Sequence, residues 1–320
     1  SKNNEGTIIT QYSMDELAYL GLLKMDFLGL RNLTMITRAI EIIAKTRDIN
    51  IDLNTIPIND DKVFKMISEG NLAGIFQLET STGMKQVARE MKPSTLEDLS
   101  ALIALFRPGP LDTGMITEFI DRKNKKKEIR YLLPELEPIL KDTYGSIVYQ
   151  EQIMQISQII AGYSLGQADI LRKAMGKKQV DEMIKQRTIF LEGSAKNGYT
   201  SELANELFDT MEKFAEYGFN KSHSVAYAII TYRTAYLKAN YPIEYMAALI
   251  SSVMTNPEKV PLYISETKRM GIKVLSPDVN CSESGFSISS DSIRFGLKAV
   301  KGVGDNVISE IIQTRKKDAP

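Results

Sequence analysis

From about residue 60 to about residue 260, the sequence reads as a succession of helices separated by short breaks. Apolar residues recur there at helical spacing, and Gly or Pro interrupts the pattern only briefly. A tract of this kind confines the chain to a mainly α fold. The expected helices are residues 62–69, 81–90, 95–105, 150–161, 179–196, 201–215 and 221–240.

The two ends of the chain show other patterns. Residues 19–30 form a short apolar run that ends near a Gly, which is typical of a buried strand. Residues 33–44 follow at helical spacing, as a helix packed behind that strand. Beyond Pro261, short strands are expected at 272–275, 286–289 and 293–296, the last two joined by a Ser-Asp turn. The fold class is therefore α+β, mainly α with a small β contribution.

The composition excludes several classes of protein. Forty Lys and Arg balance forty Asp and Glu, so a basic site for nucleic acid must be local. One cysteine, Cys281, and one histidine, His223, exclude a disulfide framework and zinc sites with several Cys or His ligands, and suit a reducing compartment. The chain has no long apolar run and no apolar signal core, so we expect neither a membrane span nor secretion. It begins with Ser1, so we expect a piece of a longer polypeptide.

Asp26 is unusual because it stands inside the apolar run, where an unpaired carboxylate would be costly to desolvate. On a strand, Lys24 and Asp26 would share one face. A carboxylate beside an ammonium group at a strand end could hold a divalent cation and a phosphate. An ion pair at the rim of a core accounts for the same residues, and both interpretations stay open.

The segment 214–227 gathers several polar and aromatic side chains. If a helix begins near Asn220, then Asn220, either His223 or Ser224, and Tyr227 line one of its faces, with Tyr217 just ahead and Lys221 alongside. Such a set can stack on a base and donate hydrogen bonds to phosphate or sugar. A helix with a merely solvated polar face is the alternative.

Three further segments carry basic residues. Residues 170–178 hold Arg172, Lys173, Lys177 and Lys178, which could form an anion site or a solvated surface. Arg107 stands in a Pro- and Gly-rich segment that we expect to be a rigid turn. The run 122–130 could track phosphates or be a mobile loop.

Residues 301–304, with the sequence KGVG, separate two stretches of helical pattern. Gly302 and Gly304 would let backbone N–H groups approach a phosphate at the start of the next helix. A helix-hairpin-helix holds the DNA backbone in this way without reading its sequence. An ordinary turn between helices is the alternative.

Taken together, these motifs resemble, in order, those of the C-family replicative polymerases, the alpha subunits of bacterial DNA polymerase III. The resemblance runs from about residue 12 to about residue 315. It rests on KMDFLGL at 24–30, GIFQLE at 74–79, LFRPGP at 105–110, YQEQ at 149–152, LRKAMGKK at 171–178, YGFNKSH at 217–223, PDVN at 277–280 and KGVG at 301–304.

The resemblance implies three regions: residues 1–45 as the C-terminal part of a palm, residues 46–260 as a helical fingers domain, and residues 261–320 as short strands leading into the first helix-hairpin-helix of a clamp-binding region. It also implies residue roles. Asp26 would be a catalytic, metal-binding aspartate, with Lys24 as a basic neighbour near the incoming phosphates. Nucleotide would be bound by Arg172, Lys173, Tyr217, Asn220, Lys221 and His223, and the DNA backbone by Arg107, Lys301, Gly302 and Gly304.

The activity implied is template-directed transfer of a nucleotide from dNTP to a primer 3′-hydroxyl, with two Mg²⁺ ions. The implied partners are primer-template DNA, dNTP, a sliding clamp and other replicase subunits, in the bacterial cytoplasm at the nucleoid. The family's Pro-Asp-x-Asp-x-Asp motif, with its two further metal aspartates, does not occur in these 320 residues. One aspartate cannot hold two ions, so we expect the chain alone to be inactive. A non-catalytic helical module that binds nucleotide or DNA is the alternative.

Overall fold

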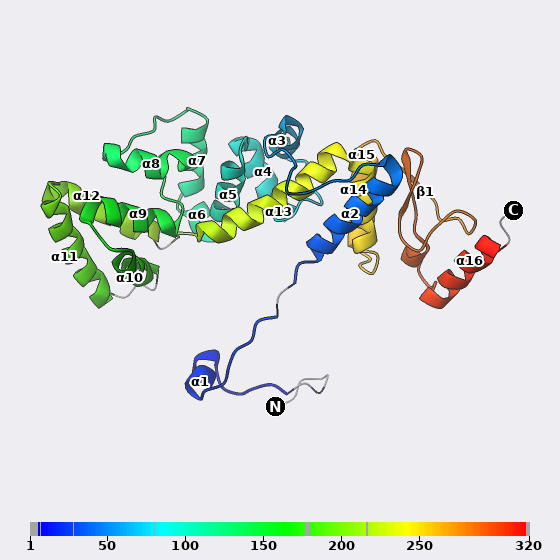
Figure 1. The fold of residues 1–320 in the computed structure, drawn as a ribbon, viewed down its shortest axis with the longest axis horizontal. Coiled ribbons are helices and arrows are strands. Elements are labelled where there is room, and N and C mark those ends of the chain that lie inside the picture. Colours follow the sequence, from blue (N-terminus) through cyan, green and yellow to red (C-terminus); the bar gives the residue numbers. More distant parts are fainter. Residues whose placement is uncertain are drawn as a thin grey trace. The chain divides into compact units, whose positions relative to one another are not determined.

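The computed structural model describes residues 6, 8–27, 29–79, 81–176, 180–215 and 217–317, and Figure 1 shows the course of the chain. The chain divides into two compact units, one up to Thr34 and one from Met35 onward. Within the described residues, no helix is long and apolar enough to cross a membrane. The expected class, mainly α with a small β contribution, is confirmed.

The elements follow one another in this order along the chain: α1 Met14–Tyr19, α2 Arg31–Arg47, α3 Asp61–Ser68, α4 Thr82–Met91, α5 Leu96–Leu105, α6 Pro108–Asp112, α7 Met115–Lys123, η1 Pro134–Leu136, α8 Glu137–Leu140, η2 Lys141–Thr143, α9 Gln150–Ala161, α10 Leu165–Gly176, α11 Val180–Lys196, α12 Ser201–Ala215, α13 Lys221–Asn240, α14 Pro242–Ser252, α15 Lys259–Arg269, β1 Lys273–Leu275, β2 Ser287–Ser289, β3 Ser292–Arg294, η3 Leu297–Ala299 and α16 Asp305–Lys317.

The first unit differs from the sequence prediction. Residues 22–27 are extended but form no strand, and the Leu23 and Phe27 side chains are 83% and 91% exposed. The prediction of a buried strand over residues 19–30 is therefore wrong for the described part of that run; Leu28 lies outside the described residues. The reason is that a strand needs a neighbour for its backbone N–H and C=O groups, and no described segment pairs with this one.

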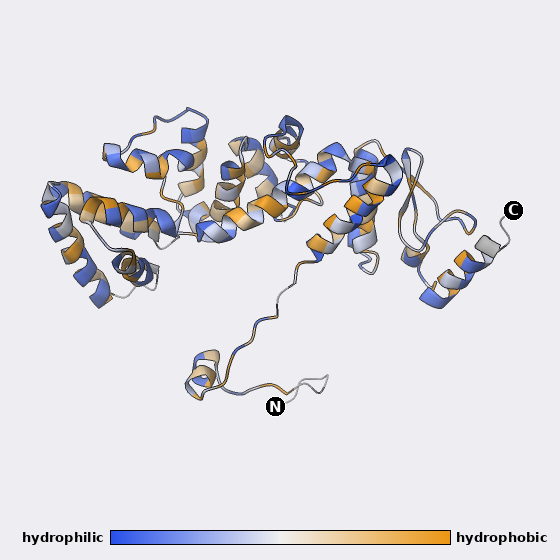
Figure 2. Ribbon diagram, viewed as in Figure 1, coloured by the Kyte–Doolittle hydropathy of each residue, from blue (hydrophilic) through white to orange (hydrophobic). Residues whose placement is uncertain are grey.

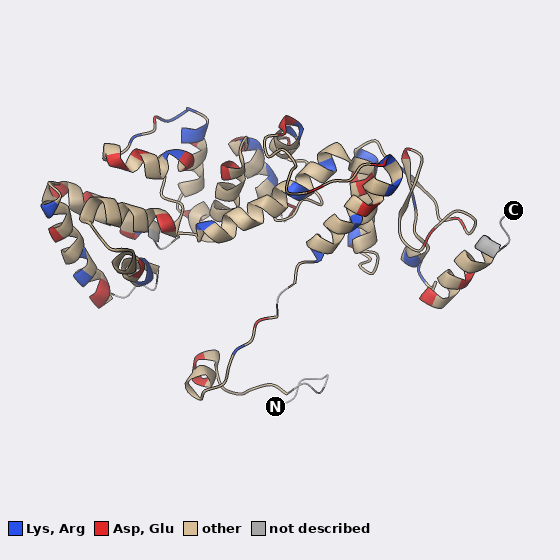
Figure 3. Cartoon of the chain, viewed as in Figure 1, with Lys and Arg blue, Asp and Glu red and all other residues tan. Residues whose placement is uncertain are grey.

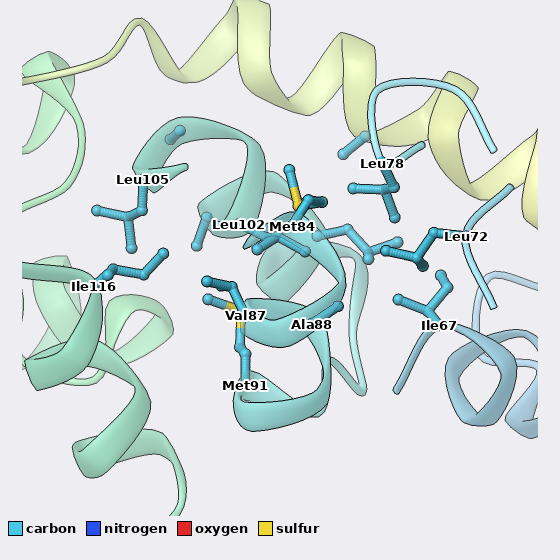
Figure 4. Packing of buried hydrophobic residues seen from close by; sticks show 14 of the residues in the cluster. Ile67, Leu72, Leu78, Met84, Val87, Ala88, Met91, Leu102, Leu105 and Ile116 are labelled. Atoms are coloured by element: carbon cyan, nitrogen blue, oxygen red, sulfur yellow. The ribbon is translucent and has the colours of Figure 1, made fainter. Parts of the chain in front are cut away.

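The centre of the second unit is built around the long helix α13, which packs on α5 and α3. Small side chains, Ser224, Ala228, Thr231 and Ala235, recur on its buried face at helical spacing and let α5 approach closely. Apolar side chains of α3, α4, α5 and α7, and of the segment between α3 and α4, fill the adjoining core. Figure 4 shows Ile67, Leu72, Leu78, Met84, Val87, Ala88, Met91, Leu102, Leu105 and Ile116.

A second core lies among helices α8 to α12. Tyr163, Phe190 and Phe208 form a chain of ring contacts there, with centroid separations of 6.3 and 5.4 Å. Helix α11 can approach α9 because residue 193 is Gly: a Cβ at that position would lie 2.1 Å from the carbonyl oxygen of Ala161. Figure 2 shows both apolar and polar residues along these helices, as expected for elements that bury one face.

A third core joins α2, α14 and α15 to a small sheet. The strand order is β1-β3-β2, with β1 parallel and β2 antiparallel to β3, and Ile293 pairs with Val274 on one side and Ile288 on the other. The three short strands expected near the C-terminus are thus confirmed, each within one or two residues of its predicted bounds. The expected helices of the tract 60–260 are confirmed as well.

The structure also contains helices that the sequence pattern did not reveal: α1, α7, α10, α14 and α15. The expected rigid turn at residues 107–110 is instead the start of α6, with Arg107 at the N-cap and Pro108 in the first helical position. This is where Pro is tolerated, because the first N–H groups of a helix have no intrahelical partner. Figure 3 shows Lys and Arg interspersed with Asp and Glu along most helices, in line with the zero net charge.

Candidate nucleotide-binding site

The start of α13 is fixed by its own sequence. The predicted beginning of a helix at Asn220 is confirmed, because α13 begins at Lys221 with Asn220 at its N-cap. The Asn220 Oδ1 atom accepts a hydrogen bond of 2.8 Å from the backbone N–H of His223. This is the usual role of Asn at a helix start, where free N–H groups also carry partial positive charge.

Aromatic rings line the exposed side of this first turn. The His223 imidazole is stacked on the Tyr227 ring, with centroids 4.2 Å apart and planes at 27°. The Phe219 ring meets the imidazole edge-on at 5.5 Å, and Phe76 lies 5.3 Å from Tyr227 on the inner side. The His223 side chain is exposed at the surface. The predicted face of His223 and Tyr227 therefore exists, as an ordered aromatic row.

Arg107 holds the segment ahead of α13 in place. Its Nη2 and Nε atoms donate hydrogen bonds, each of 2.7 Å, to the carbonyl oxygens of Tyr217 and Ala104, and its guanidinium lies 4.6 Å from the Phe219 ring centroid. Burial lowers its pKa. The Tyr217 ring also covers Gly109, where a Cβ would lie 2.4 Å from the ring. Arg107 thus contacts its own chain; its predicted contact with the DNA backbone stays a prediction.

The start of α9 meets the start of α13. The Phe219 N–H donates to the carbonyl of Val148, and the Gln150 N–H donates to the carbonyl of Phe219, both at 3.0 Å. The carboxylate of Glu151 accepts the Lys221 N–H at 2.9 Å, and the Lys221 ammonium lies 5.5 Å from the ring centroid of Tyr149. The YQEQ motif therefore holds the YGFNKSH motif by backbone and side-chain contacts.

A buried row of hydroxyl groups supports Tyr149 from below. Its OH lies 2.9 Å from the Ser100 Oγ atom, which is 2.8 Å from the Ser224 Oγ atom. Burial raises the pKa of Tyr149 to about 12, so the phenol stays neutral near pH 7. These contacts connect α5, α9 and α13 beneath the aromatic row.

Arg172 joins this neighbourhood from α10. Its Nη1 atom donates to the Gln150 Oε1 atom at 3.2 Å, and its Nε and Nη2 atoms donate to one carboxylate oxygen of Asp169 at 2.9 and 2.8 Å. Lys173 pairs with the other oxygen of Asp169 at 2.8 Å. Hydrogen bonds from Lys173 and Arg172 lower the pKa of Asp169. Lys177 and Lys178 lie outside the described residues.

The sequence prediction missed Asp169, Gln150 and Glu151 as members of this cluster. Asp169 carried a signal, because it stands three and four residues before Arg172 and Lys173 on a helix. Gln150 and Glu151 carried none beyond their place in a motif, since their contacts are made with residues far along the chain. The contacts thus bring together Arg107, Arg172, Tyr217, Asn220, Lys221 and His223.

Lys24 and Asp26 lie in the first unit. The Lys24 ammonium is 3.3 Å from the Asp26 carboxylate, and their side chains are 64% and 60% exposed. The ion pair expected as one alternative is therefore present, but it is exposed to solvent and does not border a core. Among the described residues, no three His, Cys, Asp or Glu side chains gather where they could hold a metal ion. Asp26 alone does not fit a site for two ions.

The predicted glycine hairpin follows η3. Gly302 has a φ of +86°, which Gly adopts readily, and α16 begins just after Gly304. Lys298 pairs with Asp305, the first residue of α16, at 2.8 Å, whereas Lys301 is exposed. A groove of about 990 Å³ separates this hairpin from α15, and its lining includes Lys268, Lys298 and Lys301.

Two family models and several curated relatives match the chain. A family model described as the bacterial DNA polymerase III alpha subunit finger domain matches residues 32–198, and a helix-hairpin-helix motif matches residues 271–320. The chain is 49% identical to DNA polymerase III subunit alpha of Escherichia coli K12 over 97% of its length and 48% identical to that of Bacillus subtilis over 99%. The corresponding protein of Aquifex aeolicus is 46% identical over 98%.

The chain spans only about a quarter of these relatives, 27% of the Escherichia coli and Aquifex proteins and 28% of the Bacillus protein. The finger-domain match nevertheless covers more than half of its residues and includes α9 and α10, with Gln150, Glu151 and Arg172. The chain therefore belongs to the family of bacterial DNA polymerase III alpha subunit finger domains.

Proposed function

We propose that the chain supplies the fingers, with adjoining segments, of a replicative DNA-directed DNA polymerase. The observation that carries this proposal is the cluster around the starts of α9 and α13. There the Arg172 guanidinium contacts Gln150, the Lys221 ammonium lies over the Tyr149 ring, and the His223 imidazole stacks on Tyr227. Such a surface suits a dNTP, whose triphosphate needs cations and whose base offers a flat face.

In this proposal, the chain's own residues bind and orient the nucleotide. Arg172, Lys173 and Lys221 neutralise triphosphate charge, and the helix dipole of α13 adds partial positive charge at its first turn. Tyr217 and His223 pack against sugar or base. The side-chain oxygen of Asn220 is engaged in the helix cap, so the residue offers its amide nitrogen as a donor. Transfer to a primer 3′-hydroxyl then depends mainly on alignment.

Two Mg²⁺ ions need more ligands than the described residues of this chain bring together. The exposed Asp26 carboxylate is available as one Mg²⁺ ligand, with Lys24 beside it for a phosphate oxygen. When bound, two Mg²⁺ ions would activate the primer hydroxyl and stabilise charge on the triphosphate. Since one carboxylate does not hold both ions, the remaining ligands would come from other parts of a longer polypeptide.

We extend the proposal to the organisation of the chain. Residues 1–45 would complete a palm, residues 46–260 form the fingers, and residues 261–320 lead into a helix-hairpin-helix region that contacts the DNA backbone through Lys301, Gly302 and Gly304. The exposed hairpin and its lysine-lined groove support the last assignment. A sliding clamp, other replicase subunits and a place at the bacterial nucleoid in the cytoplasm belong to the same proposal.

Steady-state kinetics of the complete polypeptide that contains these residues test the nucleotide site. We expect Arg172→Ala and His223→Ala each to raise the KM for dNTP about tenfold, the effect of losing one charge-assisted or stacking contact. Lys196→Ala, an exposed basic residue at the end of α11, is the matched control and should leave KM unchanged. Unchanged KM in both site variants would refute the proposal.

A non-catalytic nucleotide-binding module remains the alternative for the 320-residue chain by itself. It is favoured by the lack of a metal-binding cluster among the described residues. Primer extension with the chain alone should show no Mg²⁺-dependent incorporation, and incorporation above background would exclude this alternative.

A further inference from the structure

The proposed nucleotide cluster consists of Arg172 on α10 and of the residues around the start of α13. The first turn of α9 contacts both parts, yet none of its side chains has a role in the function proposed so far. Gln150 reaches Arg172 on α10, and Glu151 reaches the first residue of α13. We propose that Gln150 and Glu151 are positioning residues, which set the Arg172 guanidinium and the start of α13 relative to each other. This inference rests on the proposed nucleotide-binding function.

Gln150 is suited to this role because it is itself held in place. Its backbone N–H donates to the carbonyl of Phe219 at 3.0 Å, so its position follows the segment that precedes α13. Its Oε1 atom then accepts from the Nη1 atom of Arg172 at 3.2 Å. The other described partner of the Arg172 guanidinium is Asp169 on its own helix. Gln150 therefore fixes the position of the Arg172 guanidinium relative to the start of α13, where His223 lies.

Glu151, the next residue of the same turn, contacts the start of α13. Its carboxylate accepts the Lys221 N–H, while the side chain of Asn220 accepts the His223 N–H, so the two acceptors together fix the first turn of α13. A carboxylate beside a triphosphate site repels the ligand, so its contribution is geometric and not attractive. Gln in its place keeps an acceptor oxygen and removes the negative charge.

A double-mutant cycle in the complete polypeptide tests Gln150. We expect Gln150→Ala to raise the KM for dNTP about fivefold with kcat nearly unchanged, and to have no further effect in an Arg172→Ala background. Gln155→Ala, an exposed residue on the same helix, is the control and should match the wild type. An equal KM increase in both backgrounds, or none in either while Arg172→Ala raises KM, would overturn the positioning role.

Conservative rescue tests Glu151. We expect Glu151→Ala to raise the KM for dNTP about fivefold and Glu151→Gln to stay within about twofold of the wild type. Equal KM increases in both variants would show that the charge itself is needed, and wild-type KM in Glu151→Ala would show that the contact is dispensable; either result contradicts the inference. Failure of the proposed function is recognised separately, because Arg172→Ala and His223→Ala would then leave KM unchanged.

Discussion

Two lysine–carboxylate pairs in this chain have opposite surroundings. The Lys24–Asp26 pair spans 3.3 Å with both side chains mostly exposed, in a segment that no described residue covers. The Lys238–Glu266 pair spans 2.9 Å with side chains 1% and 10% exposed. Exposed pairs contribute little to stability, whereas breaking a buried pair leaves a charge without compensation. The exposed pair therefore contributes little to the fold, whereas the buried pair stabilises it.

The buried pair connects three segments of the second unit. Besides Glu266, the Lys238 ammonium donates to the carbonyl oxygens of Asn71 and Ala73, at 3.0 and 2.8 Å. Arg269 donates to the same Glu266 carboxylate. Burial favours the protonated form of Glu266, but the hydrogen bonds from Arg269 and Lys238 outweigh it and lower the pKa to about 2. The pair therefore joins α13 to α15 and to the loop before Gly74.

The largest effect that the comparison predicts is on turnover. Asp26→Asn in the complete polypeptide should reduce kcat by about a thousandfold or more, because a metal ligand and its charge are lost. The same change should leave the free energy of unfolding within about 0.5 kcal/mol, since the side chain is exposed. Single-turnover incorporation and denaturant titration measure the two quantities. Near wild-type turnover would remove Asp26 from the site.

The reverse behaviour is expected at the buried pair. Glu266→Gln should lower the free energy of unfolding by about 3 kcal/mol, because the buried Lys238 ammonium loses its carboxylate. Urea unfolding at neutral pH measures the loss, and Glu258→Gln, an exposed change just before α15, is the control. A stability equal to that of the control would mean that water or a neighbouring group compensates the lysine.

The pH dependence sharpens the same contrast. A carboxyl group with a depressed pKa contributes stability above its unfolded pKa of 4.5 and loses it as the pH falls toward the folded value of about 2. Between pH 7 and pH 3, Glu266 should therefore account for about 2 kcal/mol of the acid-induced loss of stability. The Glu266→Gln variant should not show this part of the loss in unfolding free energy when it and the wild type are titrated with denaturant at both pH values. An identical acid profile for the two proteins would contradict the pKa assignment.

The smallest effect concerns a close contact at the nucleotide cluster. In Gly109→Ala, the new methyl group would lie 2.4 Å from the Tyr217 ring, which must move. We expect the KM for dNTP to rise about fivefold with little change in melting temperature, because Tyr217 is half-buried and does not belong to any of the three cores. Gly166→Ala is the control, because a Cβ at residue 166 would meet open space. Gly114→Ala is unsuitable because Gly114 has a positive φ. Unchanged KM would exclude Tyr217 from nucleotide contact.

The sequence predicted the parts of the fold that depend on neighbours along the chain. The helix at Gln150–Ala161 and the Asn220 cap are examples, because spacing and capping are local properties. The prediction of a buried strand around Asp26 was wrong. The apolar pattern indicates burial, but a strand is buried only where a partner segment pairs with it. Gln150 and Arg107 act through residues 22 and 110 positions away, and no local pattern encodes such contacts.

Helix α13 has the proposed nucleotide cluster at its first turn and the Lys238–Glu266 pair near its last. Twenty residues of α-helix span about 30 Å, so one continuous element connects these two distant sites. Because α5 and α3 pack on α13 between these two ends, a single helix ties the position of the cluster to the contact between α13 and α15.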